Sequence, residues 1–358
     1  MPDYAEMYDF QNLYGAHKAA RRGKQDKAEV IAFEMNLAEN LCALQRHLRD
    51  RTYTQRGYYH FMIYEPKPRS IYAPYYADRV VQHCLCDNII VPTLEPHLVY
   101  DNAACRVSKG THFALNRLTG FLCDFYRQHG TEGYFLKCDI RKFFDNIDHD
   151  ILKQRLRKVF RQPDTFALLC HIIDGYEKTP GKGLPLGNQT SQWFALYYLD
   201  AMDRLIKEEL RIKYYTRYMD DFVLLHANKQ YLRECLARIA EACRSDLTLE
   251  LNEKTQIFPV RNGVDYLGWR FYLASSGKVI KKLRASNKKR LKKRLKGLQR
   301  GYGNETLDYD AVKRSLVSTQ GHLMYGHTYK LRRKLGAKTV FTRGDTTGAQ
   351  SPLQPVEC

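Results

Sequence analysis

Three aspartates stand at positions where carboxylates are costly to bury. Asp139 ends the apolar run Tyr-Phe-Leu-Lys-Cys, so it is expected at the exit of a buried strand. Asp220 and Asp221 are adjacent, and an apolar extended segment lies on each side of them. Neighbouring carboxylates in such surroundings repel each other and lose hydration, and a cation compensates for both effects. The pattern therefore predicts a site for Mg²⁺, which prefers a few carboxylate oxygens and keeps positions open for phosphate.

Two such ions, about 3.5–4 Å apart, can activate an attacking hydroxyl and stabilise the leaving oxygen of an in-line displacement. The alternative for Asp220-Asp221 is an ordinary polar turn, because Tyr-x-Asp-Asp is a weak signal when it stands alone. The motif gains its weight from the segments that accompany it.

Both helices and strands are predicted around these acids. The hydrophobic spacing predicts helices at 37–51, 78–91, about 149–160 and about 190–210. Extended segments are predicted on both sides of Pro66 and Pro68, at 134–138, and at 211–218 and 222–227. The mixture indicates an α+β fold, and the sequence shows no internal repeat.

Composition narrows the class of protein. The 358 residues suggest two or three structural units at about 150 residues each. No stretch approaches the roughly 18 apolar residues of a membrane span, and the first residues do not read as a secretion signal. The ten cysteines are scattered, which is typical of reduced, buried thiols in a cytosolic protein. His83, Cys84 and Cys86 form the one cluster that suggests zinc, but their segment has helical spacing, so a core helix is favoured.

The positive charge is concentrated near the carboxyl end. Lys and Arg number 58 against 39 Asp and Glu, a formal balance of +19. Segment 278–300 holds 12 Lys or Arg and no acid, and segment 330–334 is a second basic group. A solvated helix face or a membrane surface would be alternatives, but no lipid anchor accompanies the segment. A phosphate backbone is the favoured partner, because each cation near a phosphate releases counterions.

The motifs together resemble a known family. Tyr218-Met219-Asp220-Asp221 resembles the YxDD signature of reverse transcriptases, and segment 135–149 is similar to the palm motif that carries the first catalytic aspartate. The remaining motifs follow in family order: EPKPRSIYAP, ADRVVQHCL, GLPLGNQTSQ, LELNEKTQI and DYLGW. The resemblance covers about residues 55–335.

The resemblance implies a right-hand polymerase with fingers, palm and thumb, the palm built on an antiparallel sheet. The expected domains are N-terminal helices and fingers at 1–133, palm at 134–275 with a helical insertion at about 149–180, a basic helical thumb at 276–336, and a disordered tail at 337–358. The implied partners are template RNA, an RNA–DNA duplex and dNTPs.

The motifs resemble one subgroup of reverse transcriptases more than the others. Leu186 precedes Gly187, and Gln192 follows Ser191, where most reverse transcriptases carry Gln-Gly and Ser-Pro. This pattern resembles the reverse transcriptases of diversity-generating retroelements, as do YDFQNLYGAHKAAR, AACRVSKGTH and GHLMYGHTYKLRRKL. The subgroup implies mutagenic retrohoming: error-prone cDNA synthesis, chiefly opposite template adenines, from a template-repeat RNA in the cytoplasm of a bacterium or its phage. It also implies a small basic, oligomeric accessory protein.

Two alternatives stay open. A retron-like or orphan reverse transcriptase would share the chemistry and copy with ordinary fidelity. A catalytically idle RNA-binding scaffold would keep the fold without the reaction, but Asp139, Asp220, Asp221 and Lys254 are all present.

The resemblance assigns the roles around the metal. Asp139, Asp220 and Asp221 would hold two Mg²⁺ ions, or Mn²⁺, with the Ile140 carbonyl as an additional ligand. Lys254 matches the lysine that protonates departing pyrophosphate, although its spacing from the preceding Asn is one residue tighter than the commoner pattern. A surface charge is the alternative for Lys254, as it is for Lys67 and Arg69.

Further residues would contact the nucleotide and the primer. Lys67 and Arg69 would grip the triphosphate, Arg69 with a fork that binds two oxygens. The other members of the nucleotide site are an aromatic steric gate, Phe144, and Leu186, Gly187 and Gln192. Tyr266, Leu267, Gly268 and Trp269 resemble the primer grip. Core packing is the alternative for Phe144 and Leu186.

Overall fold

The computed structural model describes residues 2–64 and 68–343. Its internal contacts divide the chain into two compact units, each formed by two stretches of sequence. The first unit comprises Met1–Arg117 and Leu136–Ile257, and the second comprises Leu118–Phe135 and Phe258–Cys358. The division into fingers, palm and thumb stays a prediction. Lys67 and most of the expected tail, 344–358, lie outside the described residues.

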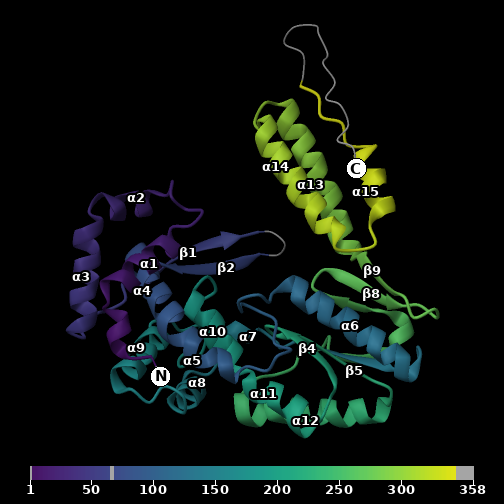
Figure 1. The fold of residues 1–358 in the computed structure, drawn as a ribbon, viewed down its shortest axis with the longest axis horizontal. Helices are drawn as coiled ribbons and strands as arrows, with labels where there is room; N and C mark the ends of the chain where they lie inside the picture. Colours follow the sequence, from purple (N-terminus) through teal and green to yellow (C-terminus); the bar gives the residue numbers. More distant parts are fainter. Residues whose placement is uncertain (1, 65–67, 344–358) are drawn as a thin grey trace. The chain divides into compact units, whose positions relative to one another are not determined.

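Helices and strands occur in both units (Figure 1). The α-helices are α1 (Phe10–Ala20), α2 (Ala28–Met35), α3 (Leu37–Arg49), α4 (Tyr76–Leu85), α5 (Val91–Leu94), α6 (Thr111–His129), α7 (Phe143–Asn146), α8 (His149–Arg157), α9 (Pro163–Asp174), α10 (Gln189–Tyr198), α11 (Asp200–Arg204), α12 (Lys229–Leu247), α13 (Ala285–Gly303), α14 (Tyr309–Met324) and α15 (Tyr329–Gly336). The strands are β1 (Tyr58–Ile63), β2 (Arg69–Pro74), β3 (Tyr134–Cys138), β4 (Tyr214–Tyr218), β5 (Asp221–His226), β6 (Gln256–Pro259), β7 (Val264–Tyr266), β8 (Trp269–Leu273) and β9 (Val279–Leu283). The predicted α+β class is confirmed.

The strands form three sheets. β1 and β2 make an antiparallel hairpin, and the order of the four-stranded sheet is β4-β5-β3-β6. β4 and β5 pair antiparallel with Tyr218 opposite Asp221. The third sheet has the order β7-β8-β9, with both pairings antiparallel.

The N-terminal helices follow the apolar spacing of the sequence. Asp9 begins α1, because its carboxylate accepts a hydrogen bond from the Asn12 backbone N–H and so satisfies one of the free donors of the first turn. In α3 the leucines at helical spacing, Leu41, Leu44 and Leu48, are buried. The predicted helix at 78–91 is confirmed as α4 and the turns that continue it to α5, and Cys84 and Cys86 lie in its buried face.

Two predicted helices differ from the structure in their bounds or type. The helix expected at about 190–210 is broken, since α10 ends at Tyr198 and α11 begins at Asp200. In the basic segment 278–300, for which a helix is expected, the first residues form strand β9 and the helix begins only at Ala285. The physical reason is tertiary pairing: every residue of Val279–Leu283 pairs antiparallel with β8, from Leu273 opposite Val279 to Trp269 opposite Leu283. The charged run that follows is α13, which packs beside α14 (Figure 1).

The described residues contain no helix long and apolar enough to cross a membrane.

Candidate active site

Asp220 lies at the tip of a tight hairpin turn. β4 ends at Tyr218 and β5 begins at Asp221, so only Met219 and Asp220 connect the two strands. Met219 has a φ of 55°, in the left-handed region that glycine occupies most readily. Two-residue hairpins favour such a positive φ because it matches the twist of the strands. The predicted pair of strands is confirmed, and its turn is one residue shorter than the sequence suggested.

The three aspartates act on one another electrostatically. The pKa of Asp220 is raised to about 6, first by burial and then by the negative charges of Asp139 and Asp221. A hydrogen bond from its own backbone N–H and the charge of Arg217 work in the opposite direction. Asp139, which follows β3, therefore lies close enough to Asp220 to act on it, although the two are 81 positions apart in the sequence.

Lys137 is a neighbour of these acids that sequence reasoning missed. Its Nζ lies 3.4 Å from Asp221 Oδ1 and 3.5 Å from Asp221 Oδ2. Lys137 belongs to β3 and stands two residues before Asp139, so both side chains emerge on the same face. A lysine inside an otherwise apolar strand run, in period-2 register with an acid, was the signal that could have found it.

The segment that carries Lys254 runs alongside Asp139. The Asn252 backbone N–H donates to the Asp139 carbonyl at 2.7 Å, and the Lys254 N–H donates to Asn252 Oδ1 at 3.1 Å. Ile140, which is buried, forms an isolated antiparallel bridge with Leu251. The backbone therefore brings the loop of Lys254 to the first aspartate, while the Lys254 side chain is exposed.

The donor set suits a hard cation. Within 2–64 and 68–343, no three His, Cys, Asp or Glu side chains enclose a ready-made metal cage. The donors near the hairpin are nevertheless carboxylate oxygens from Asp139, Asp220 and Asp221, the ligand type that Mg²⁺ prefers. Burial first, and then the charges of Asp139 and Asp221, raise the pKa of Asp220, and a cation beside the carboxylates would offset both effects. These residues therefore fit a divalent metal.

Leu186 and Gly187 are bound to the hairpin β1–β2. The Tyr72 backbone N–H donates to the Leu186 carbonyl at 3.0 Å. Gly187 has a φ of 125°, and a Cβ at this position would lie 3.0 Å from Ile71 Cγ2. Packing against β2 is thus a reason for glycine here that the sequence did not reveal. Arg69 begins β2 and is exposed.

The other two nucleotide-site candidates lie on helices. Phe144 is half-buried in α7, edge-on to the buried ring of Phe143 at 5.5 Å between centroids. Gln192 is exposed on α10, where its Oε1 accepts a hydrogen bond from the Cys105 thiol at 3.2 Å. The roles of Phe144 and Gln192 toward a nucleotide stay predictions.

The segment resembling a primer grip is a tight hairpin in the second unit. Tyr266 pairs with Trp269 across β7 and β8, and both side chains are buried in the core of that unit. Leu267 and Gly268 form the turn with positive φ, and Asn287 Nδ2 donates to the Gly268 carbonyl at 3.0 Å. The turn, rather than the buried rings of Tyr266 and Trp269, is therefore the part of this hairpin that is placed to touch another molecule.

The profile of the reverse transcriptase (RNA-dependent DNA polymerase) family matches residues 68–271, more than half of the chain. The chain belongs to the reverse transcriptase family. Among curated proteins, this reverse transcriptase is 23% identical over 265 residues to the group II intron-encoded protein LtrA of Lactococcus lactis subsp. cremoris, and the match covers 70% of this chain. It covers 42% of LtrA, so this reverse transcriptase spans about two fifths of the length of that relative.

Solved structures similar to this reverse transcriptase include two telomerases. An apo telomerase from Candida tropicalis aligns with a TM-score of 0.45 at 16% identity, covering 64% of this chain and 49% of that chain. A telomerase from Candida albicans in complex with the TWJ fragment of telomeric RNA aligns with a TM-score of 0.47 at 12% identity, covering 68% and 48%.

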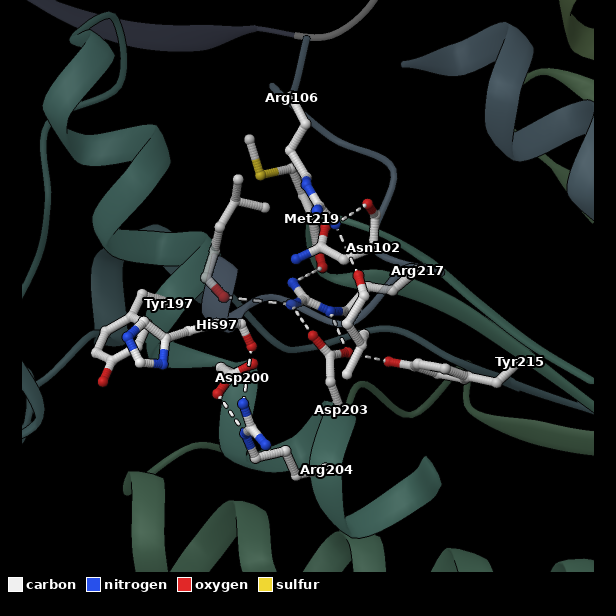
Figure 2. A network of polar contacts seen from close by, with 12 residues as sticks. His97, Asn102, Arg106, Tyr197, Asp200, Asp203, Arg204, Tyr215, Arg217 and Met219 are labelled. Carbon is white, nitrogen blue, oxygen red and sulfur yellow. Dashed lines mark hydrogen bonds and ion pairs between the residues drawn. The ribbon is translucent and has the colours of Figure 1, made fainter. Parts of the chain in front are cut away.

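Beneath the β4–β5 hairpin of this reverse transcriptase lies a polar network that sequence reasoning did not find. Arg217 of β4 and Asp203 of α11 form an ion pair, and neither side chain is exposed to solvent (Figure 2). A second pair, Asp200 and Arg204, lies on the same helix. The available signal was an arginine in the apolar run before Tyr218, because a buried guanidinium requires an acid from elsewhere.

Proposed function

We propose that this chain is an RNA-directed DNA polymerase that uses Asp139, Asp220 and Asp221 to extend a primer with dNTPs on an RNA template. The observation that carries the proposal is that Asp139, which follows β3, and Asp221 act electrostatically on Asp220 at the tip of the β4–β5 hairpin, in a chain of the reverse transcriptase family. The same coupling argues against an idle RNA-binding scaffold, because a scaffold gains nothing from holding three acids against their repulsion.

The three carboxylates, with the Ile140 carbonyl as an additional ligand, would hold two divalent ions, Mg²⁺ or Mn²⁺. When bound, Mg²⁺ lowers the pKa of an attacking hydroxyl and neutralises developing charge on phosphate. The protein's part is to hold the three acids close together, and Lys137 offsets part of their negative charge by its position beside Asp221. Catalysis of this kind depends on positioning and charge neutralisation more than on covalent chemistry.

The remaining residues would bind and orient the substrates. Arg69, exposed at the start of β2, would hold the triphosphate, together with Lys67 on the sequence pattern alone. Lys254, on the loop beside Asp139, would donate a proton to the departing pyrophosphate. Phe144 would exclude a 2′-hydroxyl, the group that distinguishes ribonucleotides. Leu267 and Gly268 would press on the primer strand.

We further propose that the enzyme serves a diversity-generating retroelement and copies a template-repeat RNA with errors at adenines. Leu186 supports this proposal, because an apolar side chain offers shape alone where a glutamine would offer hydrogen bonds, and so discriminates less. The charge of +19 supports binding to RNA. The proposed setting is the cytoplasm of a bacterium or phage host, with a small basic oligomeric accessory protein as partner. A retron-like or orphan enzyme of ordinary fidelity is the second candidate.

The test is primer extension on a defined RNA, followed by sequencing of the cDNA. The wild type is expected to incorporate dNTPs with Mg²⁺, and Asp220→Ala to lose incorporation. Asp246→Ala is the matched control, since this acid lies at the exposed end of α12. Unchanged incorporation by Asp220→Ala would refute the assigned carboxylates.

The same cDNA decides between the two candidates. Errors concentrated at template adenines support the retroelement enzyme, and Leu186→Gln is then expected to reduce them, with Leu186→Met as the apolar control. A low error rate, spread evenly over the four template bases, would leave the retron-like or orphan enzyme as the function.

A further inference from the structure

All three side-chain nitrogens of Arg217 donate hydrogen bonds beneath the β4–β5 hairpin. Its Nε donates to Asp203 Oδ1 at 2.7 Å, and its Nη2 bonds Asp203 Oδ2. Nη1 donates to the Met219 carbonyl at 3.0 Å, and Nη2 also reaches the Leu196 carbonyl at 3.2 Å. Tyr215 donates its hydroxyl to Asp203 Oδ1. Figure 2 shows Asp203 and Met219 at the guanidinium of Arg217, with Tyr215 pointing toward Asp203.

The backbone of Arg217 is held as firmly as its side chain. Its N–H donates to the Asp101 carbonyl at 3.1 Å, and its carbonyl accepts from the Ala103 N–H at 2.9 Å. The strand that leads into the hairpin is therefore tied to the 101–103 loop on one side and to α11 on the other. Rigid support of this kind is what a site needs when its groups must be held in one geometry.

Stability alone is a poor reason for this arrangement. The exposed fraction of both Arg217 and Asp203 is 0%, and burying two charges carries a desolvation cost that their attraction must first offset. Replacing a buried ion pair by apolar side chains of similar volume is often neutral or stabilising. A buried pair is better explained by a geometry that it enforces.

The geometry in question is that of the Met219–Asp220 turn. Met219 has a φ of 55°, a left-handed conformation that is strained for a residue other than glycine. The Met219 carbonyl belongs to the peptide bond that precedes Asp220, so fixing this oxygen fixes the plane from which the Asp220 side chain departs. Arg217 is the side chain that donates to it.

We propose that Arg217, locked by Asp203, is the positioning residue that holds the Met219–Asp220 turn in its catalytic conformation. Arg217 touches neither substrate nor metal; it acts through Asp220. The inference rests on the proposed polymerase function, and it adds to the catalytic machinery an ion pair that lies outside the motifs.

The test compares three variants. The double variant Arg217→Met/Asp203→Leu removes both charges and keeps an apolar volume. Arg217→Lys keeps the charge, but a single ammonium cannot bond Asp203 through two nitrogens and also reach the Met219 carbonyl. Arg204→Met is the matched control: it breaks another Arg–Asp pair of α11, at 2.9 Å, without touching the hairpin. The readouts are the thermal midpoint, Mn²⁺ affinity by electron paramagnetic resonance, and kcat and KM for dNTP per folded molecule.

The expected result is a kcat lowered about 10- to 100-fold in the double variant and in Arg217→Lys, with KM for dNTP within about twofold of the wild type. Mn²⁺ affinity should fall severalfold in both. The thermal midpoint of the double variant should fall, because Asp203→Leu removes the acceptor of the buried Tyr215 hydroxyl, and kcat and affinity are therefore compared per folded molecule. Arg204→Met should keep its kcat and its Mn²⁺ affinity.

The inference is overturned if either hairpin variant keeps kcat and Mn²⁺ affinity within twofold per folded molecule, because the pair would then serve stability alone. Should the double variant not fold, Arg217→Lys decides by the same two quantities. A wild-type protein that does not extend primers contradicts the proposed function instead, and in that case Mn²⁺ affinity alone tests the role of Arg217.

Discussion

At the scale of single residues, the site holds three negatively charged side chains close together although they repel one another. At Asp220 this cost appears as a raised pKa, because the side chain is partly desolvated and the charges of the other two acids act on it. Lys137 reduces the cost at Asp221. Lys137 of β3 and Asp221 of β5 are therefore neighbours, and this lysine offsets negative charge at one of the acids proposed to perform the reaction.

The raised pKa of Asp220 predicts how the metal-free protein responds to pH. Because the folded-state pKa is about 6 and the ordinary value is 3.8, the protonated carboxyl favours the fold, and this contribution is lost as pH rises from about 4 through 6. Mn²⁺ competes with the proton, so its affinity should increase over the same interval. Carbon NMR of the aspartate carboxyls should give a midpoint near 6 for Asp220 without metal.

Asp139→Asn supplies the control for this titration. Removing the Asp139 charge should lower the midpoint of Asp220, because a repulsion that raises its pKa is gone. Asp246→Asn, at the exposed end of α12, should leave the midpoint unchanged. A midpoint for Asp220 near 4 in the metal-free wild type would contradict the electrostatic account of the site.

At the scale of elements, the hairpin β1–β2 and the loop that begins α10 depend on one glycine. Gly187→Ala places a Cβ 3.0 Å from Ile71 Cγ2 and forces a φ of 125° on alanine. We expect a loss of about 1–3 kcal/mol in the free energy of unfolding, measured by urea titration, and a higher KM for dNTP. Gly15→Ala, in α1 with open space around it, is the control and should stabilise by about 0.5–1 kcal/mol. If Gly187→Ala and Gly15→Ala had equal free energies of unfolding, close packing against Ile71 would not be the reason for glycine at position 187.

The elements also show how far the sequence could be interpreted. The strands around Asp220 and the strand before Asp139 were predictable, because a short apolar run that ends at an acid is typical of a buried strand that ends at the surface of a site. The start of α13 was not, because charge and apolar residues at 278–284 fit a strand or a helix equally until the pairing with β8 is known. Tyr266 and Trp269 look like surface contacts in a motif, but their burial depends on packing that no local pattern encodes.

The same limit applies to the site itself. Asp139, Asp220 and Asp221 could be identified as candidates from residue type and spacing. Lys137 and Arg217 could not be given partners, since Asp221 and Asp203 reach them only through tertiary structure. Sequence patterns therefore pointed to the acids, and the structure was needed to show what supports them.

At the scale of the whole molecule, the excess positive charge and the acids proposed to catalyse the reaction lie in different parts of the chain. The acids lie in the first unit, whereas the 12 Lys or Arg of segment 278–300 lie in the second. A duplex backbone offers the positive residues a regular row of phosphates, and binding of this kind releases counterions without reading bases. The cations of α13 should therefore govern affinity for the duplex, and the acids of the first unit the rate of the reaction.

This division predicts different effects of salt on binding and on rate. Lys289, Lys293 and Lys296 are exposed and lie at helical spacing on α13. Changing all three to Gln should weaken binding to an RNA–DNA duplex and reduce the slope of log K against log salt by about 0.9 for each phosphate that is no longer neutralised, with kcat at saturating duplex unchanged. The measurement is duplex binding by fluorescence anisotropy over a range of salt concentrations, beside single-turnover extension.

Changing the same three residues to Arg keeps the charge and should keep the slope. A triple Gln variant with an unaltered slope would show that the cations of α13 face away from nucleic acid, and one with a lowered kcat would show that the two roles are not separate.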